Sequence, residues 1–272
     1  MSLAWRSRRP RTAEAVRYEV ICRIIDVHAH LCDKVFDPDR AEVLERARQA
    51  GLIAVVAVGE DLADARRNLE LSAAHPSIRA AAGLYPTRLS LERANEMQGF
   101  IRARREELVA IGEVGLDHWA VKEEAQLELQ REIFRGFIDL AKELDLPLNV
   151  HSRSAGRAAI ALLLEQGATK VHLHAFDGKA ASALPAVEAG YYFSVPPSVV
   201  RSEQKRKLVK RLPLSCLMIE TDSPVLGPSL GERNEPANAA VALRAIAEIK
   251  GVSEAEVADV TLENTRRLYR AL

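Results

Sequence analysis

Eight short apolar runs, rich in β-branched residues, recur along the chain, and amphipathic helical stretches lie between most of them. Regular alternation of strands and helices is typical of a parallel sheet covered by helices. Eight such units without a break in composition predict an α/β protein with a closed (β/α)8 TIM barrel. The expected strands are Ile24–His28, Ile53–Gly59, Arg79–Tyr85, Leu108–Val114, Pro147–His151, Lys170–His174, Gly190–Val195 and Leu217–Asp222.

The clearest helical pattern is Glu124–Leu144, whose apolar residues keep to roughly one face. An open doubly wound sheet is the main alternative architecture, but no glycine-rich phosphate loop supports it. We therefore expect one barrel domain over residues 21–272, after a basic, disordered leader over residues 1–20, for which a nucleic-acid-binding arm is the alternative. Other expected helices are Asp39–Ala50, Asp61–Ala74 and Ala155–Gln166.

The charge balance argues against one class of protein. Lysine and arginine total 38, equal to the 38 acidic residues, so a broad basic face that coats nucleic acid is not expected. A nucleic acid substrate that is bound by a metal site is still compatible with this charge balance.

No apolar run reaches the ~18 residues that a membrane span needs. The cysteines Cys22, Cys32 and Cys216 are odd in number and lack C-x-x-C spacing. We expect a cytoplasmic protein with reduced thiols and no membrane contact.

Side chains of the types that bind metals fall at or next to the ends of five expected strands. The C-terminal ends of all the strands lie at the same rim of a barrel, and barrel active sites lie at that rim. His28 and His30 share one side of the first strand because side chains alternate along it. Packing alone does not explain so many histidines and acids at one rim, so we expect a metal site. Its candidate ligands are His28, His30, Glu113, His151, His174 and Asp222.

The ligand types narrow the choice of metal. Imidazole together with carboxylate suits borderline divalent ions such as zinc, manganese or iron, whereas magnesium prefers more oxygen ligands. Six ligands are too many for one tetrahedral zinc but suit two ions that share a bridging carboxylate. We therefore expect two divalent ions, zinc as bound, with magnesium or manganese as the alternatives in function.

Five motifs contain these residues, and a sixth follows the last expected strand: Asp26-Val-His-Ala-His30, Gly112-Glu-Val-Gly-Leu-Asp117, Asn149-Val-His-Ser-Arg153, His174-Ala-Phe-Asp-Gly178, Glu220-Thr-Asp-Ser-Pro224 and Arg233-Asn-Glu-Pro236. In this order they resemble the successive motifs of the TatD family, which comprises metal-dependent deoxyribonucleases among the amidohydrolase-like barrels. The stretches NVHSRSAGR, SVPPS and RNEP are most similar to the subgroup called TatD domain-containing protein three. The resemblance runs from about Ile24 to the C-terminus.

The resemblance implies a role for each ligand. His28 and His30 would hold one metal, His151 and His174 the other, and Glu113 would lie between them. Asp222 would complete the first site and face the nucleophilic water. Two positions depart from the family pattern and are left without a role. Tyr85 stands where many relatives have histidine, and His118 stands where an aromatic residue is common.

The reaction that the resemblance implies is hydrolysis of a DNA phosphodiester by a water that two metal ions activate. Asp222 would accept the proton of that water and later protonate the leaving oxygen. Arg153 would help the metals to stabilise the charge of the transition state. The expected catalytic residues are thus Asp222, Glu113 and Arg153. DNA is expected as a transient partner of a monomer.

Four polar residues precede a ligand by two positions, so period two predicts that they point into the barrel one layer below the ligands. There they either orient the ligands or form a polar plug satisfied by buried water. They are Asp26, Asn149, His172 and Glu220. A basic cluster on a short helix after the seventh strand is expected to be a solvated helix face, with contact to a DNA backbone as the alternative. It consists of Lys205, Arg206, Lys207, Lys210 and Arg211.

Two other functions stay open. The same barrel and metals could hydrolyse a cyclic amide, a lactone or the ester of an aminoacyl-tRNA. A lysine at the end of the fourth strand, able to be carboxylated, would favour the amide branch, but Glu113 stands there. The third interpretation of the sequence is a non-catalytic barrel that binds a metal for stability. The complete ligand set with Asp222 argues against it, because a structural site has little need of an open coordination position.

Overall fold

The computed structural model describes residues 23–269. The expected leader over residues 1–20 lies outside the described residues, and so does Cys22. Cys32 and Cys216 are buried free thiols. None of the helices in the described part of the chain combines the length and hydropathy needed to cross a membrane.

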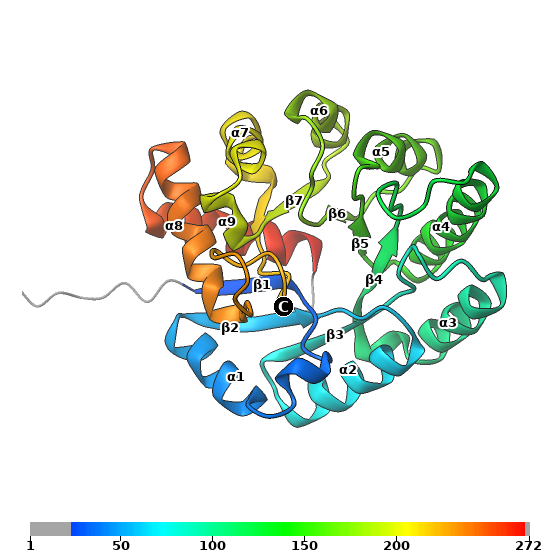
Figure 1. Cartoon of the computed structure of the whole chain (residues 1–272), viewed down its shortest axis with the longest axis horizontal. Helices are drawn as coiled ribbons and strands as arrows, with labels where there is room; N and C mark the ends of the chain where they lie inside the picture. Colours follow the sequence, from blue (N-terminus) through cyan, green and yellow to red (C-terminus); the bar gives the residue numbers. More distant parts are fainter. Residues whose placement is uncertain (1–22, 270–272) are drawn as a thin grey trace, which may run out of the picture.

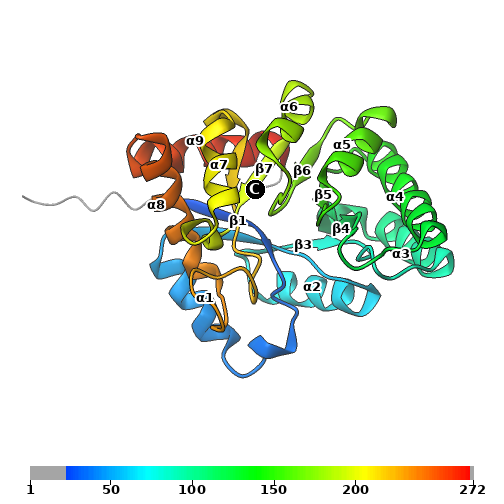
Figure 2. The ribbon, with the colours of Figure 1, turned by 45° about the horizontal axis from the view of Figure 1, so that its top comes forward.

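Eight parallel strands follow one another around the sheet in chain order, each paired with the next. Figures 1 and 2 show these strands at the centre of the molecule and the helices around them. The expected (β/α)8 TIM barrel is confirmed. The strands are β1 Ile24–Ala29, β2 Leu52–Ala57, β3 Ile78–Ala82, β4 Leu108–Gly115, β5 Leu148–His151, β6 Val171–Leu173, β7 Tyr192–Val195 and β8 Leu217–Ile219.

A helix follows each strand, and a further helix ends the described chain. The helices are α1 Arg40–Gln49, α2 Leu62–Ala74, α3 Leu91–Ala103, α4 Glu124–Leu144, α5 Gly156–Glu165, α6 Ala180–Glu188, α7 Glu203–Arg211, α8 Ala239–Lys250 and α9 Glu254–Leu268. Short 3₁₀ turns lie at Lys34–Phe36, Arg105–Glu107, Pro197–Val200, Leu214–Cys216 and Pro236–Asn238. The apolar face expected on α4 is confirmed, since Ile133, Phe134, Phe137 and Ile138 are all buried.

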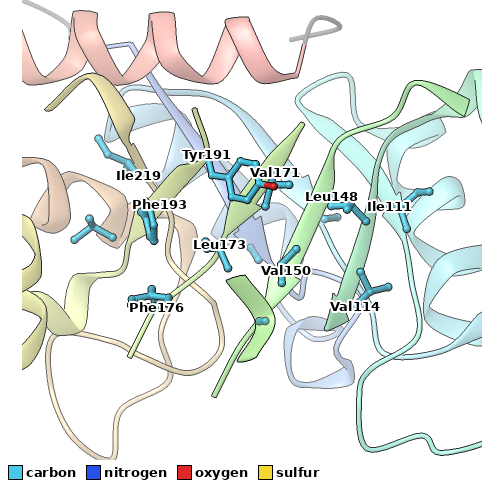
Figure 3. Packing of buried hydrophobic residues seen from close by; sticks show 14 of the residues in the cluster. Ile111, Val114, Leu148, Val150, Val171, Leu173, Phe176, Tyr191, Phe193 and Ile219 are labelled. Carbon is cyan, nitrogen blue, oxygen red and sulfur yellow. The ribbon is translucent and has the colours of Figure 1, made fainter. Parts of the chain in front are cut away.

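Alternation along the strands separates an apolar layer from a polar interior. In β5, Leu148 and Val150 belong to the large apolar cluster, whereas Asn149 and His151 make polar contacts across the barrel. Figure 3 shows Leu148 and Val150 beside Leu173 of β6 and Phe193 of β7, which belong to the same cluster. The outward residues thus stabilise the fold, and the inward positions are left to polar side chains.

The barrel is closed at its rim rather than along a full β1–β8 ladder. The amide of Asp222 donates to the carbonyl of His28 at 2.8 Å, and the amide of His30 donates to Ser223 at 2.8 Å. Deeper in the barrel, the Asp26 carboxylate accepts a hydrogen bond from the amide of Thr221 at 2.9 Å. Three candidate ligands therefore belong to the seam that joins the first strand to the last.

Several strands end earlier than the sequence pattern predicts. β3 ends at Ala82 instead of Tyr85, β6 ends at Leu173, and β8 ends at Ile219. The chain leaves the ladder there to turn over the rim, and Ala175 and Asp222 adopt positive φ angles of 43° and 54°. His174 and Asp222 therefore lie just beyond their strands rather than within them.

Candidate metal centre

The six candidate ligands meet at the C-terminal rim of the barrel. Two groups of three have ligand atoms that all lie within 4.8 Å of one another: His28, His30 and Asp222 form one, and His28, Glu113 and His174 the other. All six are buried except His30, which is half-buried. The structure thus brings together the side chains that the strand ends predicted.

On one side of the centre, two histidines face two carboxylates. Asp222 Oδ1 lies 3.5 Å from His28 Nε2 and also 3.5 Å from His30 Nε2. Glu113 Oε2 lies 3.3 Å from His30 Nε2 and 3.8 Å from His28 Nε2. These nitrogens and oxygens converge on one small volume.

The other oxygen of Glu113 faces a second pair of histidines. Glu113 Oε1 lies 2.6 Å from His151 Nδ1 and 2.8 Å from His174 Nε2. Those two nitrogens are 3.3 Å apart. The carboxylate of Glu113 therefore has one oxygen in each half of the centre, which is the arrangement that a bridging ligand requires.

Two atoms of this centre are buried without a hydrogen-bond partner among the described residues. They are His28 Nε2 and Glu113 Oε2, whereas a third such atom on a candidate ligand, His174 Nδ1, lies on the side of Glu220. A buried polar atom left without a partner costs about 1–3 kcal/mol. A divalent cation between these atoms would remove that cost, and imidazole with carboxylate is a ligand set that such ions accept. The residues present therefore fit a metal centre.

Both carboxylates of the centre are in the ionised form that binds cations, and these carboxylates raise the pKa values of His28, His30 and His151 above the ordinary value. Burial alone would raise the pKa of the Glu113 carboxyl, but its interactions with the imidazoles of His174 and His151 hold it well below its ordinary value. For Asp222 burial acts in the same direction, and the adjacent imidazoles of His28 and His30 lower its pKa below the ordinary value. Burial lowers the pKa of His174 to about 4, so its imidazole is neutral. Ionised carboxylates and a neutral imidazole are the forms that bind metals.

The four polar residues expected below the ligands are fully buried inside the barrel. Asn149 contacts a ligand directly, since its Oδ1 lies 2.8 Å from His28 Nδ1. The Asn149 amide group donates to Val27 O at 3.0 Å and to the Tyr269 hydroxyl at 3.2 Å. This network fixes the ring of His28 with its Nε2 toward the centre.

The other three residues of that layer hydrogen-bond to backbone or neighbouring polar groups, and Glu220 Oε2 also lies 3.8 Å from Nδ1 of the candidate ligand His174. The Asp26 carboxylate accepts from the amide of His28 at 3.2 Å. Glu220 accepts from the amide of Ala175 at 2.8 Å and from the Ser194 hydroxyl at 2.5 Å. The nitrogens of His172 lie 2.8 Å from the Tyr269 hydroxyl and 2.5 Å from that of Ser194. Burial raises the pKa of Asp26 to about 7 and that of Glu220 to about 8.

Asp117 contacts a ligand, although the sequence reasoning gave it no role. Its Oδ2 lies 3.1 Å from His151 Nε2, and its Oδ1 accepts from the amides of Trp119 and Ala120 at 2.9 and 2.8 Å. Burial alone would lower the pKa of His151, but the charges of Glu113 and Asp117 raise it to about 9. The only sequence signal for this contact is that Asp117 ends one of the motifs quoted above.

A cavity of about 770 Å³ opens above the centre. Tyr85 lines it, with its ring 5.0 Å from that of His151 in an edge-on contact. Arg153 lines it too, and its guanidinium lies 3.7 Å from the centroid of the Trp119 ring. His118 is absent from the described residues that line the cavity. The cavity therefore places Tyr85 and Arg153 beside any bound substrate.

Comparison with known proteins shows the family of the chain and agrees with its fold. The family model described as TatD related DNase matches residues 25–270. The human protein named Deoxyribonuclease TATDN3 is 44% identical over 262 residues, which are 92% of this chain and 95% of that protein. YabD of Bacillus subtilis, named an uncharacterized metal-dependent hydrolase, is 36% identical over 256 residues, 91% of this chain and 99% of YabD. The crystal structure of YjjV, a TatD homolog from Escherichia coli K12, superposes with a TM-score of 0.85 at 30% identity, covering 92% of this chain and 99% of YjjV.

Proposed function

This chain belongs to the TatD-related DNase family, and we propose that it is a deoxyribonuclease that hydrolyses phosphodiester bonds with divalent metal ions held at the barrel rim. One observation carries the proposal. The two oxygens of Glu113 face separate sets of histidine nitrogens, with Oε2 3.3 Å from His30 Nε2 and Oε1 2.8 Å from His174 Nε2. One carboxylate between two sets of nitrogens supports a centre for two ions.

In this proposal His28, His30 and Asp222 hold one ion, and His151 and His174 hold the other. Glu113 belongs to both positions. The mixed nitrogen and oxygen ligands support zinc as the bound ion, with magnesium or manganese as alternatives. The cytoplasmic location, the monomeric state and the boundaries of the leader and the barrel domain stay predictions from the sequence.

Divalent cations held here would lower the pKa of a water molecule and polarise the phosphoryl oxygen. Asp222 then accepts the proton of that water and returns it to the leaving oxygen of DNA. Asp222 lines the cavity, and its carboxylate is ionised because the imidazoles of His28 and His30 lower its pKa below the ordinary value. Arg153, on the cavity wall, adds positive charge for the phosphoryl oxygens.

Hydrolysis of a cyclic amide, a lactone or an aminoacyl ester is the competing proposal. Glu113 stands at the strand end where a carboxylated lysine would favour amide chemistry. The name of the human relative supports DNA as the substrate. A purely structural metal is disfavoured, because a cavity of about 770 Å³ gives a substrate access to the centre.

The test is a DNA cleavage assay on Asp222→Asn. The substitution removes the proton acceptor, so turnover should fall about 10²–10⁴-fold, while thermal unfolding stays close to that of the parent protein. Asp139→Asn is the matched control, because Asp139 lies on the exposed face of α4 and is not among the residues that line the cavity. Near-normal cleavage by metal-loaded Asp222→Asn would exclude the role of Asp222.

A further inference from the structure

Helix α7 carries a cluster of basic residues, one of which differs from the others in its surroundings. Arg206 pairs with Glu248 at 2.9 Å and Lys207 pairs with Glu203 at 2.8 Å, on the outside of the molecule. Lys205 instead precedes the buried Leu208 and Val209 by three and four positions, so it shares their inward face. The basic cluster is thus a solvated face with one lysine turned inward.

The ammonium of Lys205 lies beside the metal centre. Its Nζ donates to the carbonyl of Ala175 at 2.9 Å, and Ala175 directly follows the candidate ligand His174. An ammonium has three donors, and Ala175 O is its one hydrogen-bond acceptor among the described residues. Lys205 also lines the cavity above the centre. Its remaining N–H groups are therefore free for a ligand in the cavity.

Three cations line the cavity in the described part of the chain, and Lys205 is the one held most firmly. Lys34 and Arg153 are exposed, and the guanidinium of Arg153 stacks on Trp119. Lys205 is half-buried and fixed by its hydrogen bond to Ala175. A preorganised charge in a partly dry site stabilises an anion more than a mobile, solvated charge does.

We propose that Lys205 binds a phosphoryl oxygen of the substrate beside the position held by His151 and His174, and so selects anionic phosphate esters over neutral amides and lactones. The inference deepens the proposed function and rests on it. A phosphate ester carries negative oxygens for the ammonium to bind. A neutral ring substrate offers the ammonium no negative oxygen, so the charge of Lys205 would be balanced by the carboxylates of Glu220, Asp177 and Asp222 rather than by the substrate.

A purely structural role for Lys205 makes a different prediction. The loop that follows His174 is also tied to α7 by Gln204, whose amide group donates to Gly178 O at 2.7 Å and to Phe176 O at 3.4 Å. If Lys205 only tethers this loop, then removing the neighbouring tether should have the same consequences. Gln204→Ala therefore serves as a control that loosens the loop without changing a charge.

The experiment measures binding of inorganic phosphate to the metal-loaded full chain by calorimetry, with metal content determined for every variant. Lys205→Gln removes the charge and keeps a donor for Ala175 O, and Lys205→Met removes both. Loss of one charged hydrogen bond should weaken phosphate binding about 10- to 100-fold. Lys207→Gln, which removes an exposed charge from the same helix, should bind phosphate like the parent.

Phosphate binding by Lys205→Gln at parental strength would overturn the proposal, and so would a parent protein that binds no phosphate. An equal weakening in Gln204→Ala would assign the effect to the loop instead. The readout does not use DNA cleavage. A parent that binds phosphate through Lys205 yet cleaves no DNA would therefore contradict the proposed function and leave this inference standing.

Discussion

Glu113 is the residue at which the two halves of the candidate centre meet. Its Oε1 lies 2.6 Å from His151 Nδ1, and its Oε2 lies 3.3 Å from His30 Nε2. His151 presents Nδ1 rather than Nε2 to the centre, because Asp117 lies 3.1 Å from Nε2 on the far side of the ring. The orientation of a single imidazole thus depends on a carboxylate outside the ligand set.

The first prediction concerns this carboxylate. Asp117→Asn keeps an oxygen for the amides of Trp119 and Ala120 but loses the charge beside His151. Residues that orient a ligand typically change metal affinity about 10- to 100-fold when they are substituted. We expect a loss of that size for one of the two ions, measured by competition with a chromogenic chelator. Unchanged affinity for both ions would refute an orienting role.

Some of the residue positions at the centre could be predicted from the sequence, and some of the contacts between residues could not. That the six candidate ligands converge at one rim was predictable, because each lies at or next to the end of an apolar strand. The contact of Asp117 with His151 and the inward turn of Lys205 were not. Both depend on how loops and helices from different parts of the chain approach one another. Neither periodicity nor motif spacing contains that information.

At the scale of elements, the approach of β4 to β5 fixes the distance between Glu113 and His151. Gly115 pairs with His151 and has a φ of +144°. A Cβ atom built on Gly115 would lie 2.1 Å from His151 O, a backbone atom that cannot move aside without separating the strands. A side chain at this position would therefore displace both strands and the ligands that they carry.

The second prediction uses this close approach. Gly115→Ala should lower the free energy of unfolding by about 1–3 kcal/mol, measured by denaturant titration, and should weaken metal binding. Gly99→Ala is the matched control, because Gly99 lies in α3 with no atom within 4 Å of its built Cβ. That control should be neutral or more stable by about 0.5–1 kcal/mol. Equal stability of the two variants would contradict this packing argument.

The order and number of the elements were predictable, but their ends were less so. Alternating apolar runs placed all eight strands in sequence, and the expected Glu124–Leu144 helix has the bounds of α4. The third strand was expected to reach Tyr85 but ends at Ala82. Apolar residues continue past the last ladder hydrogen bond there, since rim loops can bury apolar side chains without pairing. Hydrophobicity alone therefore overestimates strand length at the rim.

At the scale of the whole molecule, the barrel keeps its polar groups in the interior and at the rim. The interior layer joins the ligands to α9 through the Tyr269 hydroxyl, which lies 2.8 Å from His172 Nδ1 and 3.2 Å from Asn149 Nδ2. The barrel itself was predictable from the repeated strand and helix units. Its closure was not, because the seam uses backbone hydrogen bonds between His28 and Asp222 rather than a regular ladder.

The central claim is that the rim residues hold two divalent ions and that these ions are required to cleave DNA. Elemental analysis of the purified full chain, combined with an assay on single-stranded DNA before and after chelation, tests it most directly. We predict two ions per chain, cleavage that a chelator abolishes, and recovery when metal is restored. Bound metal without DNA cleavage, or cleavage that persists once chelation has removed the metal, would contradict the account.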